Sequence, residues 1–188
     1  MKPAAFLTAL QTATQQLRAT AQAEFGTLDL PLLNHKPSPT GWSILECLEH
    51  LNRYSRFYNP QLAKALAQPA AVVPTQEVGY SWMGRKTVDM LRPENLKKHT
   101  TLKHMNPHGS RLGREVLAEF LTHQTQLLEL LTQAQYADLN RKAVPVEFFK
   151  LLKLRLGEAL EFMVVHQQRH LQQSLRVKAG LLQMHLAC

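Results

Sequence analysis

The chain of 188 residues contains four long stretches in which apolar residues recur with the period of an α-helix. They lie near residues 3–24, 42–66, 112–134 and 147–179. No stretch shows a convincing alternation of apolar and polar residues, as a half-buried strand would. Because each amphipathic helix must bury its apolar face against another, long helices with few strands predict an all-α four-helix bundle.

The connection between the second and third predicted helices is much longer than the others. It covers about residues 68–110 and is the least regular part of the chain. A connection of this length predicts a long crossover between helices 2 and 3 instead of a simple hairpin. The chain is long enough to bury one sizeable core, so we interpret residues 1–188 as a single domain.

Composition indicates where the protein resides. No segment approaches the roughly 18 consecutive apolar residues of a membrane span, and the N-terminal stretch is amphipathic, unlike a signal peptide. Cys47 lies inside a predicted helix and Cys188 is the last residue, so a framework disulfide is not expected. The sequence therefore predicts a cytoplasmic protein with no membrane partner.

The formal net charge is +8, and many of the basic residues gather in the segment 92–114. This segment has no aromatic residues interleaved with its charges, as a surface for single-stranded nucleic acid would. It also has no helix-turn-helix, zinc-finger or RNP-type pattern. The sequence thus argues against a nucleic-acid partner, and the segment is either a solvated loop or a contact for an anionic molecule.

Three histidines stand out because of their spacing. His166 and His170 lie four residues apart in a predicted helix, so their imidazoles point the same way and can grip one metal ion. His50 lies at the border of the buried arc of the second helix. Three neutral imidazoles would leave an open position, as in a catalytic zinc site. The simpler alternative is a set of hydrogen-bonded core histidines.

Two residues near His50 are further candidates. Glu46 lies one turn before His50 and can accept the second ring N–H of a ligand histidine or act as a general base. It is equally explained by a capping box with Ser43, three residues earlier. Cys47 would supply a thiolate ligand, although a small buried side chain is the simpler interpretation.

Two motifs in this sequence resemble the signatures of the DinB-like (YfiT-like) superfamily. In GWSILECLEHLNRY a Trp-Ser pair opens the second helix and a His-Leu pair follows about seven residues later. In FMVVHQQRHLQQ a His-x-x-x-His is followed three residues later by Gln173. The two motifs occur in the family's order, with the long connection before the third helix, so the resemblance covers essentially the whole chain.

The resemblance implies a four-helix bundle that binds a divalent metal through three histidines. These map one by one onto His50, His166 and His170. Zinc is the expected metal and nickel the alternative, and a homodimer is the expected assembly. The family's characterised activities are mostly thiol-dependent: S-transfer of bacillithiol, glutathione or mycothiol, and mycothiol-dependent isomerisation. The family pattern leaves the reaction of this chain open.

Two functions compete at this stage. The first is a metal-dependent enzyme that activates a thiol or water for attack on a small-molecule substrate, as a thiol S-transferase or a hydrolase. The alternative is a non-enzymatic, metal-stabilised helical bundle that acts as a stress-related binding module. A deep cleft with an open metal position favours the enzyme, whereas a fourth protein ligand such as Cys47 favours the second function.

Overall fold

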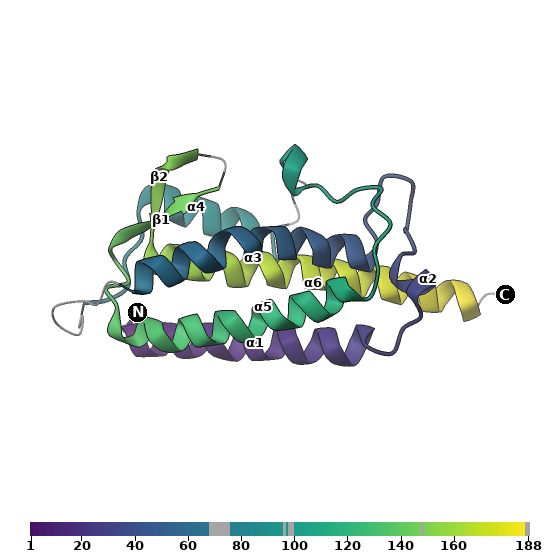
Figure 1. Cartoon of the computed structure of the whole chain (residues 1–188), viewed down its shortest axis with the longest axis horizontal. Coiled ribbons are helices and arrows are strands. Elements are labelled where there is room, and N and C mark those ends of the chain that lie inside the picture. The colour runs from purple at the N-terminus through teal and green to yellow at the C-terminus, as the bar shows by residue number, and fades with distance from the viewer. Residues whose placement is uncertain (68–75, 96, 98–99, 148, 187–188) are drawn as a thin grey trace.

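The apolar faces of the four periodic stretches meet in one buried core. In the computed structural model, which describes residues 1–67, 76–95, 97, 100–147 and 149–186, these stretches form the long helices α1 (Pro3–Phe25), α3 (Ile44–Leu66), α5 (Glu115–Gln133) and α6 (Leu156–Leu186) (Figure 1). The shorter elements are α2 (Leu30–Leu33), α4 (Trp82–Leu91), the 3-10 turns η1 (Lys103–Met105) and η2 (Ala134–Tyr136), and the strands β1 (Lys142–Val146) and β2 (Phe149–Arg155). The predicted all-α bundle is confirmed.

The order of contacts along the helices fixes the topology. α3 and α5 run in the same direction, because Asn52 donates to Val116 O and Arg56, one turn on, binds Glu119. α3 and α6 run in opposite directions, since His50 lies against His170 and Tyr58 lies against Phe162. Two parallel neighbours cannot be joined by a short hairpin. The predicted long crossover between the second and third long helices is therefore confirmed, and it includes α4 (Figure 1).

The fourth long helix begins at Leu156, and the predicted start near residue 147 is wrong. Residues 142–155 form an antiparallel hairpin, β1 with β2, with irregular register. The hairpin buries Val144 and Leu154 against the bundle while Leu151 faces outward. Apolar residues are so dense in this segment that neither the helical nor the strand period stands out. The pairing of β2 with β1 then decides that the segment forms strands. The helix also continues beyond the predicted end near residue 179, to Leu186.

Buried carboxylates hold the crossover against α6. Glu158, in the first turn of α6, is fully buried and accepts hydrogen bonds from the backbone N–H of Ser81 and of Arg155. The N-terminus of α4 packs tightly on this carboxylate, since a side chain at Gly84 would overlap it. One turn further along α6, Glu161 pairs with Arg92 beyond the end of α4. Together these contacts fix α4 lengthwise on α6.

Among the described helices, none combines the length and the apolar character that crossing a membrane requires.

Replacing Ser43 by Ala is expected to lower the free energy of unfolding by about 1–2 kcal/mol, because Ser43 Oγ accepts the Glu46 N–H at the buried start of α3. The urea midpoint measures this loss. Thr8→Ala, at an exposed position of α1, is the control and should leave the midpoint nearly unchanged. Equal midpoints for both variants would contradict the role of the cap.

Candidate metal centre

The start of α3 sets the direction in which His50 points. Ser43 Oγ accepts the Glu46 N–H at 3.1 Å, and Glu46 Oε2 accepts the Ser43 N–H at 2.8 Å. This is the predicted capping box, and it starts the helix at Ile44. With that start, one edge of α3 places His50 and then Tyr54 against α6.

The three predicted histidines come together between α3 and α6. The candidate ligand nitrogens of His50, His166 and His170 all lie within 4.8 Å of one another. His50 Nε2 and His166 Nε2 are 3.1 Å apart. His50 and His166 are almost entirely buried, with exposed fractions of 2% and 4%, whereas His170 is partly exposed. Two helices far apart in the sequence therefore supply one cluster of imidazoles, open to solvent on the side of His170.

The outer ring nitrogens of two histidines are held by hydrogen bonds. His50 Nδ1 lies 2.8 Å from Met105 O, and His170 Nδ1 lies 3.0 Å from Gln173 Oε1. A carbonyl oxygen can only accept, so Nδ1 carries the proton in both rings and each neutral ring presents the lone pair of Nε2. His166 Nδ1 is buried and has no hydrogen-bond partner among the described residues. This tautomer pattern is the one that metal-ligand histidines adopt.

Burial keeps all three imidazoles neutral. Loss of solvation lowers the pKa of His50 to about 4 and that of His170 to about 3. The pKa of His166 is also lowered well below its usual range, first by burial and then by the charges that its two neighbours would carry. Three neutral imidazoles are the donor set that a divalent ion requires.

The spacing also fits an ion. Two nitrogens, each about 2.0–2.1 Å from one zinc at a tetrahedral angle, lie roughly 3.4 Å apart. The His50–His166 separation of 3.1 Å is close to this value. Without a cation, the same contact is a hydrogen bond from His166 Nε2–H to His50 Nε2, because no described residue holds a proton on His166 Nδ1. The three histidines therefore suit a shared divalent ion.

Aromatic rings that the sequence reasoning missed surround the cluster. Trp42 lies 4.8 Å from His50 and stacks on His170 at 5.6 Å, measured between ring centroids. Tyr54 meets His166 edge-on at 4.5 Å, and Phe162 lies 5.6 Å from the same ring. These rings fix the imidazoles and lower the local dielectric constant. Two features of the sequence point to these rings: Trp42 belongs to the first motif, and Tyr54 lies one turn after His50.

Glu46 is buried but does not contact the histidines. Its Oε1 accepts from Lys36 at 3.0 Å and from the Gly109 N–H at 2.6 Å, in addition to the capping bond. Gly109 has a positive φ of 80°, which glycine adopts without strain. Met105 O, not Glu46, accepts the ring N–H of His50. The role of Glu46 as a general base stays a prediction.

A cavity of about 470 Å³ opens next to Glu46. It lies between α2, the start of α3 and the end of the crossover, and Lys36 and Arg111 contribute its positive charges. The three histidines do not line it. The cavity is thus adjacent to the metal centre along α3 and does not contain it.

Cys47 is fully buried, and burial raises the pKa of its thiol to about 12. Its thiol contacts Ser174 of α6 and is not part of the histidine cluster. The simpler interpretation of Cys47, a small side chain of the core, agrees with this position. Cys188 lies outside the described residues.

Two members of the basic segment 92–114 have structural partners. Arg92 pairs with Asp89 and Glu161, and Arg114 donates to the carbonyls of Gly26 and Leu28 after α1. Lys98 and His99 lie outside the described residues. Binding of an anionic partner by this segment stays a prediction.

Residues 13–174 match the family model described as the DinB superfamily. The chain belongs to the DinB superfamily. A curated relative of this DinB superfamily protein is the uncharacterized protein YuaE of Bacillus subtilis (strain 168). It is 26% identical over 147 residues, which cover 78% of this chain and 83% of the relative. No solved structure matches the chain.

Replacing His166 or His170 by Ala is expected to abolish the binding of one zinc per chain, because each removes a ligand that the other two cannot replace. Competition with a chromophoric chelator, on protein purified without a histidine tag, measures the affinity. His123→Ala is the matched control, since His123 lies on the flank of α5 and its partners among the described residues are Glu119 and Gln126. Equal loss in all three variants would show that zinc binds elsewhere.

Proposed function

We propose that this DinB superfamily protein is a divalent-metal-dependent enzyme that activates a thiol or a water molecule for attack on a small-molecule substrate. The observation that carries the proposal is the convergence of His50, His166 and His170, whose candidate ligand nitrogens lie within 4.8 Å of one another, with the Nε2 lone pairs of His50 and His170 free for a metal. Zinc is the proposed ion and nickel the alternative, because imidazole nitrogen suits both.

A divalent ion with three neutral ligands keeps its +2 charge and lowers the pKa of a thiol or water at its open position. The chain's own residues supply the surroundings. His50 and His166 form the buried side of the site, while His170 borders solvent. The rings of Trp42 and Tyr54 flank the imidazoles and keep bulk water from them. Within the described part of the chain the cluster has three members, so a position for substrate remains.

The cavity beside Glu46 is the proposed location for the polar tail of the substrate. Lys36, Arg111 and Glu46 line it, and because Lys36 already pairs with Glu46 they leave one net positive charge; its volume of about 470 Å³ falls in the range of small-molecule sites. Low-molecular-weight thiols with carboxylate groups match this charge. Glu46 would serve as the base for a water or thiol only if it exchanged one of its present donors, Lys36 or the Gly109 N–H.

One observation favours the non-enzymatic function as a second candidate. His50 and His166 are exposed by only 2% and 4%, which is closer to a structural metal site than to an open cleft. In that case the ion would stabilise the α3–α6 contact, and the bundle would act as a stress-related binding module.

Two experiments distinguish the enzyme from the non-enzymatic bundle. The first is metal analysis of tag-free protein, and the second is a screen of thiols against electrophiles and of hydrolysable esters and amides. The enzyme is expected to lose turnover in His170→Ala and on chelation, while the apo protein stays folded, as circular dichroism would show. Loss of the fold on chelation, with no turnover in any thiol or hydrolysis assay, would contradict the enzymatic proposal and support the structural one.

The homodimer is likewise proposed. The four inward faces are used within the chain, so a two-fold interface must use other surface. Light scattering at micromolar concentration is expected to give about twice the mass of one chain, and a purely monomeric mass would contradict the proposal.

A further inference from the structure

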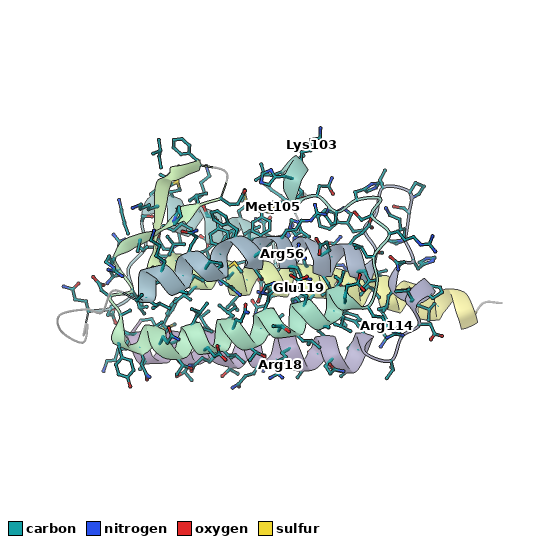
Figure 2. All side chains as sticks on the ribbon, viewed as in Figure 1. Arg18, Arg56, Lys103, Met105, Arg114 and Glu119 are labelled. Atoms are coloured by element: carbon teal, nitrogen blue, oxygen red, sulfur yellow. The ribbon has the colours of Figure 1, made fainter. Side chains whose placement is uncertain are left out.

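Arg53 connects the metal centre to the crossover. It lies one turn after His50 on α3, and its Nη1 donates to His104 O and to Asn106 O, both at 3.1 Å. These two carbonyls flank Met105, whose own carbonyl accepts the Nδ1–H of His50 at 2.8 Å. Met105 is the last residue of η1, and Figure 2 shows it on the side of that turn nearer α3. The guanidinium of Arg53 therefore binds the carbonyls on both sides of Met105, whose own carbonyl holds His50.

The guanidinium of Arg53 is itself held in place. Its Nε donates to Glu49 Oε1 at 2.9 Å, and the side chains of Arg53 and Glu49 are exposed by only 27% and 9%. A planar guanidinium with one nitrogen fixed by a carboxylate directs its others at a defined point. The direction of the Arg53 fork is therefore set by a contact within α3.

Among the described residues, the polar contacts that hold this turn are few. η1 is a single 3-10 turn, and its ends rest on the Arg53 contacts and on the side chain of His104, which lies 2.5 Å from Glu147 Oε1. Met105 is buried, whereas the His104 side chain is 60% exposed. The two bonds from Arg53 also lie near the surface, but they are charge-assisted and flank the Met105 carbonyl directly, so they anchor it.

We propose that Arg53 is a positioning residue of the metal centre, fixing Met105 O so that His50 keeps its proton on Nδ1 and presents Nε2 to the ion. The inference rests on the proposed metal-dependent function. Without Arg53, the turn loses its anchor, Met105 O moves, and His50 is free to adopt the other tautomer. A second-sphere partner of this kind typically changes metal affinity by 10–100-fold.

The first test compares zinc affinity in Arg53→Ala with that in Arg56→Ala. Arg56 is the matched control: it shares the carboxylate of Glu49, but its other partner is Glu119 on α5 (Figure 2). Arg53→Ala is expected to weaken zinc binding about 10-fold in chelator competition, and Arg56→Ala to change it less than about twofold. Arg53→Lys keeps the charge but cannot bind Glu49 and both carbonyls, so it should also bind zinc more weakly.

The second test reads the tautomer directly and needs no metal. Long-range ¹H–¹⁵N spectra of the imidazole rings should show His50 of the wild-type apo protein protonated on Nδ1. Arg53→Ala should show a mixture of tautomers at His50, and Arg56→Ala the wild-type pattern. If the wild type bound no zinc at all, the proposed function would fail, while this readout would still decide the role of Arg53.

Three outcomes would overturn the inference. The first is a single Nδ1–H tautomer at His50 in Arg53→Ala together with wild-type zinc affinity. The second is an equal loss of affinity in the Arg53 and Arg56 variants, which would indicate only a change in surface charge. The third is full affinity in Arg53→Lys, which would show that the fork is not required.

Discussion

The packing of α3 against α6 is the contact on which the rest of the site depends. It brings Nε2 of His50 and Nε2 of His166 to 3.1 Å of each other inside the core. Burial keeps the rings neutral, as the lowered pKa of His50, about 4, indicates. Two nitrogens at this distance need either a shared proton, as in a hydrogen bond, or a cation between them. The helix packing thus creates a place that a metal ion can occupy.

Two buried carboxylates fix the crossover to these two helices. Glu46 at the start of α3 and Glu158 at the start of α6 each cap their own helix and each accept a backbone N–H from the crossover, from Gly109 and Ser81 respectively. A carboxylate at a helix N-terminus is favoured by the helix dipole and by the free N–H groups there. The same groups therefore start the helices and fix the long connection on their surface.

Membership of the DinB superfamily and the histidine geometry are compatible with a metal site, but they do not identify a reaction. The ion's chemistry depends on what reaches its open position, and that is governed by Trp42, the exposed edge of His170 and the neighbouring charged cavity. The 104–106 peptide also bears on the site through Met105 O, although it lies in the crossover and not in the long helices.

The sequence by itself determined the four helices, the capping box at Ser43 and the spacing of His166 and His170, because all are set by contacts within a few residues. It also indicated His50, through the motif that places it on the second helix. Only the tertiary structure decided the start of α6 at Leu156, since strand pairing over 142–155 overrides an ambiguous apolar pattern. It alone decided that Met105, 55 residues away, accepts the His50 proton while Glu46 binds Lys36 and Gly109. A backbone carbonyl leaves no trace in the sequence, so a partner of this kind is visible only after folding.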